Sequence, residues 1–386
     1  MPNTVVQRRV VRTLAAAQVL SGVGVAGTVA AGSLLVSSIT KSETLAGLAQ
    51  TSAVLGAAAL ALPLARLTSI GGRRLALSVG YFSGVIGSIL AILGGYHRVI
   101  VLMLMGTFLV GAAAAAGYQA RFAAIDLASN ETRAKQLSFV VWGSTIGAVT
   151  GPNLMEPAGK LAEFFGLPPL VGPYLISATT LALAGVVITI FLRPDPYLLA
   201  NKDSTTSKHK GSTKKALAHI RQNPKALFAI LSIAIGHVAM VSVMVMTPVH
   251  MAHVDVSLTI IGLVISVHVL GMYAFSPLVG LLSDRLGRVR VIQIGLIVLL
   301  LSTVISGKAK ADDAYTLGVG LFLLGLGWSC TLIAGSAFLS ESVDQQFRAS
   351  SQGASDLVMN LSGAGGGAIA GVIIGTLSYG WLCFAA

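Results

Sequence analysis

Long apolar runs, separated by short polar segments, recur along the whole chain. A helix that crosses a hydrocarbon core of about 30 Å needs about 20 residues, because each residue advances it by about 1.5 Å. Eleven runs approach or exceed that length, so the pattern predicts eleven membrane-spanning helices. Their approximate limits are 14–38, 45–65, 74–95, 99–122, 137–157, 172–192, 226–250, 258–280, 290–307, 314–338 and 350–375.

The two ends of the chain need separate interpretation. Arginines precede the first apolar run, as in a secretory signal, but the run is longer than the roughly 7–15 apolar residues of such a signal. We therefore predict an uncleaved first span. The last apolar segment, Tyr379–Ala386, is too short to cross a membrane. Because the second half of the chain is shorter than the first by the length of a span with its loop, we interpret the twelfth span as truncated.

Composition indicates a bilayer environment and excludes several classes of protein. Of the 386 residues, 54% are hydrophobic and 10% are charged, whereas soluble proteins carry about 25% charged residues. A net charge of +12 could indicate a nucleic-acid partner, but the basic residues lie in gaps between apolar runs, not on one helix face. The sequence shows no metal-ligand spacing, nucleophile triad or phosphate-binding loop. It therefore predicts no enzyme activity, no metal, no cofactor and no nucleic-acid partner.

The distribution of basic residues predicts the orientation. If the N-terminus is cytoplasmic, 21 Lys and Arg residues fall on the inner side of the membrane and 5 fall on the outer side. Cytoplasmic loops of membrane proteins carry such an excess, and a miscounted span would scramble it. We predict a multi-pass protein of the plasma membrane, the inner membrane of a bacterium, with a cytoplasmic N-terminus.

One polar segment, 193–225, differs from the other connections. It contains Pro194 and Pro196, a Ser/Thr run and eight basic residues. We predict a six-helix bundle at 1–193, a cytoplasmic linker at 194–225 and a second helix bundle at 226–386. Residues 214–222 either form a short helix on the membrane surface or belong to a solvated linker, and the sequence leaves both open.

Two loops at equivalent positions of the two halves resemble each other. The loop at 65–74 follows the second span, and the loop at 280–290 follows the eighth; both contain a Gly-Arg core. Such repeats are typical of transporters built from two similar halves. The second loop, with Asp284 and Arg285 at its centre, resembles the Gly-x-x-x-Asp-Arg-x-Gly-Arg signature of the major facilitator superfamily.

A second motif supports the same resemblance. Gly147, Gly151 and Pro152 on the fifth span are similar to the Gly-x-x-x-Gly-Pro core of a motif associated with proton-coupled antiporters. Through the pattern of spans, the resemblance covers essentially the whole chain. It implies an all-α integral membrane protein with the major facilitator fold, in which two six-helix bundles surround a central site and the twelfth helix is truncated.

Several positions depart from the family pattern. Ser69 stands in the first loop where the family has its Asp, and Thr107 stands where drug–proton antiporters carry an Arg on the fourth span. The fifth-span motif also degrades after Pro152. These departures leave the branch within the superfamily open.

The resemblance implies a gate at the second loop. By family geometry, Asp284 faces the start of the fifth span, where free N–H groups and the helix dipole attract a carboxylate. We hypothesise that this contact latches the cytoplasmic side closed; alternatively, the loop only sets topology through its arginines. The residues predicted for the gate are Gly280, Asp284, Arg285, Gly287, Arg288 and Arg133.

Glycines recur at four-residue intervals on the fifth and eleventh spans, which hold equivalent positions in the two halves. This spacing places them on one helix face, where a neighbouring backbone can approach closely. The face is a surface on which the halves rock, or plain tight packing, or both. Pro152 is expected to bend the fifth span. The glycines are Gly143, Gly147 and Gly151 on the fifth span, and Gly363, Gly367, Gly371 and Gly375 on the eleventh.

Two histidines are the candidates for coupling. His237 lies eleven residues into its span and His268 ten residues into the next, so each is about 15 Å deep, near the midplane of the membrane. Ionisable residues at that depth are functional candidates, and histidine titrates near neutral pH. We predict that His237 or His268 carries a coupling proton or binds substrate. Alternatively, each is a neutral histidine that is hydrogen-bonded to a neighbouring helix.

Three further side chains have two interpretations each. Asp356, about six residues into the eleventh span, pairs with a basic residue or takes part in coupling. Arg121, at the inner end of the fourth span, pairs with an acid or snorkels, or it binds substrate. Trp328 lines an apolar cavity together with methionines of the seventh span, or it packs in the core or against lipid.

These features predict a secondary active transporter that exports small organic molecules, driven by an ion gradient through alternating access. Its expected partners are a small-molecule substrate, the lipid bilayer and protons as the coupling ion, and it is expected to be a monomer. The alternatives are an importer of a metabolite or nutrient on the same fold, and a non-transporting sensor or remnant.

Overall fold

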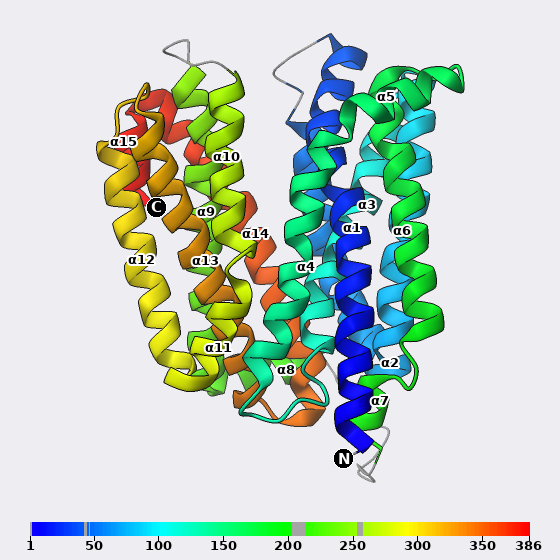
Figure 1. Cartoon of the computed structure of the whole chain (residues 1–386), viewed down its shortest axis with the longest axis vertical. Coiled ribbons are helices and arrows are strands. Elements are labelled where there is room, and N and C mark those ends of the chain that lie inside the picture. Colours follow the sequence, from blue (N-terminus) through cyan, green and yellow to red (C-terminus); the bar gives the residue numbers. More distant parts are fainter. Residues whose placement is uncertain (1, 42–44, 46, 203–212, 253–257) are drawn as a thin grey trace. The chain divides into compact units, whose positions relative to one another are not determined.

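The computed structural model describes residues 2–41, 45, 47–202, 213–252 and 258–386, and all regular secondary structure in these residues is helical (Figure 1). Each of the eleven predicted spans corresponds to a helix, to part of one, or to two consecutive helices. The prediction of an all-α protein is confirmed. The Ser/Thr run of the predicted linker, at 204–207, lies outside the described residues.

The helices have the following bounds. In the first half they are α1 (Pro2–Thr40), α2 (Leu48–Tyr96), α3 (Ile100–Ala123), α4 (Arg133–Asn153), α5 (Met155–Phe164), η1 (Pro169–Val171), α6 (Gly172–Phe191), α7 (Pro196–Ala200) and α8 (Thr213–Gln222). In the second half they are α9 (Pro224–Ala252), α10 (Leu258–Tyr273), α11 (Ser276–Leu286), α12 (Arg288–Lys308), α13 (Ala314–Ser342), η2 (Gln345–Phe347), α14 (Arg348–Thr376) and α15 (Tyr379–Ala385).

Nine helical segments of the described chain are long and apolar enough to cross a membrane. One of them, α2, contains two predicted spans, and another joins α10 to α11. The helix α4, which forms most of the fifth predicted span, is not among the nine. Polar residues at both of its ends lower its mean hydropathy. On the outside of α12, the side chains of Ile297, Leu300 and Leu301 are more than half exposed. Lipid would cover such a face, whereas in water it would promote association.

The chain divides into two compact units. The first contains Met1–Ala128, Phe139–His219 and Asp344–Leu357, and the second contains Ser129–Ser138, Ile220–Val343 and Val358–Ala386. Three helices therefore contribute to both units, and one of them is α8, whose last residues belong to the second unit. The start of α4 belongs to the second unit, and the start of α14 belongs to the first.

The helix α2 bends sharply at Gly72, between the two spans that it contains. At Gly72 φ is +85° and ψ is 176°, a conformation that is essentially restricted to glycine. A Cβ atom at this position would also collide with the carboxylate of Asp195. The bend thus depends on glycine for two separate reasons, the backbone conformation and the neighbouring acid.

We expect Gly72→Ala to lower the thermal stability of the purified protein in detergent, because the strained backbone costs roughly 1–3 kcal/mol and the added methyl displaces Asp195. Gly166→Ala separates the two effects, since Gly166 also has a positive φ of +69° but no neighbouring atom within 4 Å of the added Cβ. It should destabilise less. Gly47→Ala, with neither feature, should leave the melting temperature unchanged. Equal melting temperatures for the Gly72 and Gly47 variants would contradict this account.

Candidate functional site

In the second unit, Asp284 lies near the end of α11 and caps the first turn of α4. Its Oδ1 accepts a hydrogen bond from the backbone N–H of Ala134 at 3.1 Å, and its Oδ2 accepts one from Lys135 at 2.8 Å. A helix leaves its first N–H groups without an intrahelical acceptor, and they carry the positive end of the helix dipole. The carboxylate satisfies two of these groups from a distant part of the sequence.

Arg288 joins this carboxylate to a second one. Its Nη1 lies 2.5 Å from Oδ1 of Asp284, and its Nη2 lies 2.9 Å from Oε1 of Glu341. The same Nη2 donates to the carbonyl of Asn130. Arg133 approaches Glu341 at 3.7 Å. Three of the predicted gate residues therefore lie together, and Glu341, which sequence reasoning did not single out, connects them.

The glycines of the loop have separate roles in this geometry. Gly287 adopts φ +94° and ψ 150° in the turn between α11 and α12. A Cβ on Gly280 would collide with the hydroxyl of Ser138 and would lie 2.7 Å from the carbonyl oxygen of Ala134. Gly280 therefore permits the close approach of α11 to α4. By contrast, the side chain of Arg285 is exposed.

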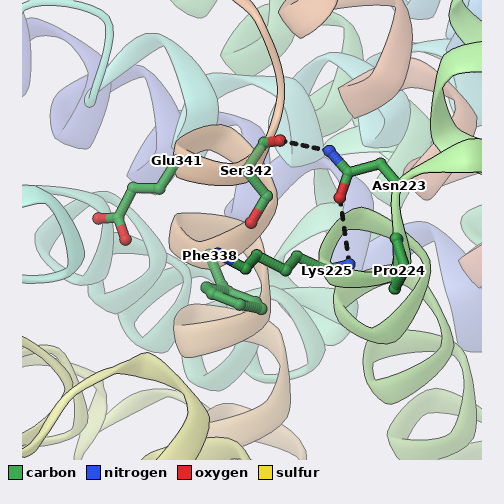
Figure 2. Close-up of a pocket in the computed structure, with 6 residues that line it drawn as sticks. All are labelled: Asn223, Pro224, Lys225, Phe338, Glu341 and Ser342. Carbon is green, nitrogen blue, oxygen red and sulfur yellow. Dashed lines mark hydrogen bonds between the residues drawn. The ribbon is translucent and has the colours of Figure 1, made fainter.

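A cavity of about 590 Å³ opens beside this network, at the junction of α9 and α13. The amide of Asn223 holds that junction together (Figure 2): it donates to the carbonyl of Ser342 at 2.6 Å and accepts from the backbone N–H of Lys225 at 3.1 Å. The cavity presents a cation, a carboxylate and an aromatic ring. It is lined by Asn223, Pro224, Lys225, Phe338, Glu341 and Ser342.

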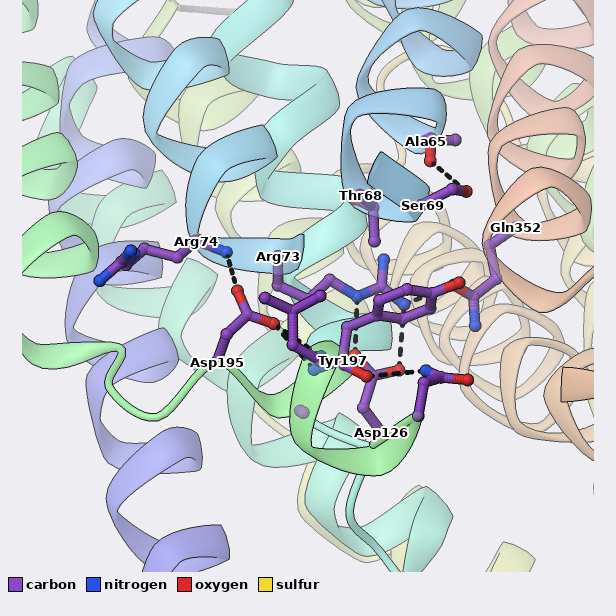
Figure 3. A network of polar contacts seen from close by, with 12 residues as sticks. Ala65, Thr68, Ser69, Arg73, Arg74, Asp126, Asp195, Tyr197 and Gln352 are labelled. Atoms are coloured by element: carbon purple, nitrogen blue, oxygen red, sulfur yellow. Dashed lines mark hydrogen bonds and ion pairs between the residues drawn. The ribbon is translucent and has the colours of Figure 1, made fainter. Parts of the chain in front are cut away.

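The first unit has its own charged network, centred on Arg73 beside the bend of α2 (Figure 3). Two guanidinium nitrogens of Arg73 contact the carboxylate of Asp126 at 2.7 and 3.1 Å, and Nη2 also donates to Oε1 of Gln352 at 2.6 Å. The ring of Tyr197 lies 5.7 Å from the guanidinium carbon. Burial raises the pKa of the Asp126 carboxyl, and the neighbouring guanidinium opposes that rise.

Ser69 and Asp195 show how the first loop differs from the second. Ser69, at the position of the family Asp, donates to the carbonyl of Ala65 within its own helix at 3.1 Å. Asp195 approaches the loop from the segment after α6, and its Oδ2 accepts the backbone N–H of Arg74 at 2.7 Å. Asp195 thus fastens α7 to the bend. The sequence did not predict that Asp126, Asp195 and Gln352 contact this loop, since no local motif marks them as its partners.

A second buried ion pair of the first unit joins α3 to the start of α14. Nη2 of Arg121 lies 2.6 Å from Oδ1 of Asp356, and the two side chains are 2% and 0% exposed. Nη1 donates to the carbonyl of Tyr118 at 2.8 Å, and the guanidinium lies over the ring of Phe122 at 4.5 Å. Arg121 therefore pairs with an acid, which was one of its two interpretations.

The glycine face of α4 packs against α1 inside the first unit. A Cβ on Gly147 would collide with the backbone of Gly22 and would lie 2.6 Å from the amide nitrogen of Val23. A Cβ on Gly151 would lie 2.8 Å from the amide nitrogen of Gly27. The two backbones therefore meet directly at Gly147 and Gly22, and at Gly151 only the methyl group of Ala26 lies as close as the backbone. We refer to this contact as the α1–α4 seam.

The remaining glycines have fewer close contacts. On α4, a Cβ on Gly143 would lie 3.0 Å from the carbonyl oxygen of Ala15. On α14, Gly363 faces the imidazole of His237, whereas Gly371 has no neighbour within 4 Å of an added Cβ; the same holds for Gly375. The side chain of Pro152 lies outside what the structure describes. The two glycine faces are thus alike in sequence but not in packing.

Both predicted histidines are buried in the second unit, together with Trp328. Trp328 Nε1 donates to Nδ1 of His237 at 3.0 Å, and Nδ1 of His268 lies 2.8 Å from the carbonyl oxygen of Leu321. Each histidine is thus bonded across to α13, as the second of their two interpretations requires. Among the described residues, no group of three or more His, Cys, Asp and Glu side chains could hold a metal ion.

The sequence matches the family model described as Major Facilitator Superfamily over residues 14–255 and again over 238–386. The chain belongs to the major facilitator superfamily. It is a multi-pass membrane protein and a secondary transporter of a small molecule, not an enzyme. This confirms the predicted fold and family.

Several members of the superfamily are similar to this chain in sequence or in fold. It is similar to the uncharacterized MFS-type transporter YdeG of Bacillus subtilis, with 36% identity over 96% of this chain and 87% of the relative. The riboflavin transporter RfnT of Brucella anthropi is 26% identical over 67% of this chain and 62% of its own length. In fold, the chain resembles the fucose:proton symporter FucP of E. coli, with a TM-score of 0.68, 17% identity and 95% coverage of both chains. The bacterial relatives indicate the plasma membrane.

We expect Gly147→Ala to destabilise the first unit, because the added methyl must push the α1 and α4 backbones apart. Overpacking of this kind costs about 1–3 kcal/mol. The matched control is Gly371→Ala on α14, where the methyl meets open space and alanine favours the helix by about 1 kcal/mol. The melting temperature in detergent should fall for the first variant and hold or rise for the second. Equal melting temperatures would show that the seam tolerates a methyl group.

Proposed function

We propose that this transporter exports small organic molecules by alternating access and draws its energy from an ion gradient. The α1–α4 seam carries the proposal. It contains Gly147 and Gly151, the glycines of the motif that resembles that of proton-coupled antiporters. Close backbone contact makes the two helices move together and leaves little space along them for ions to leak.

The second part of the proposal is a cytoplasmic latch at Asp284. With a cytoplasmic N-terminus, bundles at 1–193 and 226–386 and a linker at 194–225, the loop after α11 faces the cytoplasm. The bonds from Asp284 to two backbone N–H groups support this role. Hydrogen bonds to a charged group contribute about 1.5–3 kcal/mol, which is enough to bias a conformational equilibrium and small enough to be broken in each cycle.

Import of a nutrient is the second candidate, because the chain is similar to the riboflavin transporter RfnT. The similarity covers about two thirds of the chain, and it makes riboflavin the first compound to test. An importer and an exporter differ in the sign of net flux, not in the fold. The substrate therefore has to be found before the direction can be measured.

We expect a ligand-induced thermal-shift screen of drugs, sugars, amino acids and vitamins to yield a small organic ligand. Cells that express the protein should then accumulate less of this ligand than control cells, because export opposes its entry. An uncoupler of the ion gradient should restore accumulation. Higher accumulation in expressing cells, or rescue of a riboflavin auxotroph at limiting riboflavin, would replace export by import. Binding without flux in either direction would indicate a sensor.

We expect Asp284→Asn to reduce transport of that ligand about fivefold or more at normal expression. The neutral amide loses the charge-assisted bonds to the α4 N–H groups, which contribute about 1.5–3 kcal/mol. Ser69→Ala at the equivalent position of the first loop is the control. Its hydroxyl donates to the carbonyl of Ala65 and carries no charge to the first N–H groups of another helix, so transport should be unchanged. Wild-type rates for Asp284→Asn would exclude the latch.

A further inference from the structure

A buried aromatic–imidazole pair lies between α13 and α9. The indole Nε1 of Trp328 donates to Nδ1 of His237 at 3.0 Å, and the two side chains are 2% and 7% exposed. The ring of Tyr273 meets the indole edge-on, with centroids 5.7 Å apart and planes at 85°. The latch and the seam do not involve this pair.

The hydrogen bond determines the tautomer of the imidazole. An indole N–H can only donate, so Nδ1 of His237 must offer a lone pair. The ring is therefore neutral and carries its proton on Nε2. That edge of the ring faces α14, where a Cβ on Gly363 would lie 2.8 Å from Nε2 and 2.6 Å from Cδ2.

We propose that Nδ1 of His237 is the proton-binding site of this transporter, and that a proton bound there releases the indole of Trp328. The inference rests on the proposed ion-driven function and names its driving ion. The proton, taken from water, adds to the lone pair of Nδ1, and both ring nitrogens then carry N–H groups. Two N–H groups facing each other cannot form a hydrogen bond, so the ring and the indole must move apart.

In the described helices that face His237, no Asp, Glu, Lys or Arg competes for the proton at this depth. The facing segments contain no Asp, Glu, Lys or Arg; they are 226–252, 258–273, 291–307, 314–340 and 357–376. The other titratable groups of α9, α10, α13 and α15 are Lys225 and Glu341 near helix ends, and His250, His268, Tyr273, Tyr315, Tyr379, Cys330 and Cys383. The carboxylate of α14, Asp356, pairs with Arg121, and that of α13, Glu341, pairs with Arg288.

The proton therefore changes a contact between two helices, not only a charge. In the neutral state, the indole hydrogen bond connects α13 to α9, and the edge-on contact with Tyr273 connects α13 to α10. In the protonated state the connection to α9 is lost, and a buried imidazolium requires water or a new acceptor. Each proton that binds or leaves thus favours a different packing of these helices, which is what coupling requires.

Tryptophan fluorescence tests the switch directly. Trp142 and Trp381 are 40% and 61% exposed, so replacing both by Phe leaves Trp328 as the single emitter with little effect on the core. Its emission should show a one-proton transition between about pH 4.5 and about pH 9, the range in which histidines titrate. His237→Gln keeps an acceptor oxygen for the indole but does not titrate, so its emission should be flat. Asp356→Asn should keep the transition.

The outcomes separate the inference from the proposed function. A flat titration of the single-Trp protein, or the same transition in His237→Gln, would overturn the proton site. If His237→Gln does not fold, His237→Asn takes its place, and a transition in that variant counts equally against the site. In proteoliposomes, a pH gradient should drive accumulation of the ligand, and the glutamine variant should lose this response. If the fluorescence transition depends on His237 but the flux of the ligand does not depend on the pH gradient, the coupling role is refuted. If no flux is measured at all, transport itself is refuted.

Discussion

Close backbone contact between helices is the constraint on which the rest of this structure depends. Lipid chains are as apolar as leucine, so helices in a bilayer gain little from burying apolar side chains against one another, and small residues must bring them together. In the first unit, a Cβ on Gly111 would collide with the carbonyl of Ala53, and Gly147 meets Gly22. These contacts determine the register of neighbouring helices. The register in turn determines which polar side chains of the two helices lie opposite one another.

The polar contacts that depend on this register differ between the ends and the middle of the helices. Charged networks, such as those of Asp284 and Arg73, gather near loops. In the middle of the second unit, the bonds of His237 and His268 to α13 involve imidazole rings. A fixed charge at the membrane midplane is costly, whereas histidine can be neutral there and still accept a proton. This makes His237 suited to a site whose occupancy must change.

The sequence could predict whatever depends on local pattern. Span limits follow from apolar runs, and the contact of Asp284 with the start of α4 followed from a motif of nine residues. The partners of Arg73 could not be predicted, because Asp126 and Gln352 lie 53 and 279 residues away. Depth alone marked His237 as a candidate. Depth could not identify Trp328 as the partner of His237. A tryptophan in an apolar run looks the same in the sequence whether or not its indole N–H donates a hydrogen bond.

The two loops that resemble each other in sequence make unequal contacts. Asp284 accepts hydrogen bonds from two backbone N–H groups at the positive end of a helix dipole. The charge of the carboxylate and the dipole strengthen both hydrogen bonds. In the first unit, Ser69 bonds within its own helix, and Arg73 reaches α14 through the neutral amide of Gln352. A charged contact between α3 and α14 does exist, but it is made by Arg121 and Asp356. Asp356 lies on α14, one helical turn after Gln352. The first unit therefore holds the start of α14 by a buried ion pair between helices, whereas the second unit holds the start of α4 by a carboxylate near the end of α11.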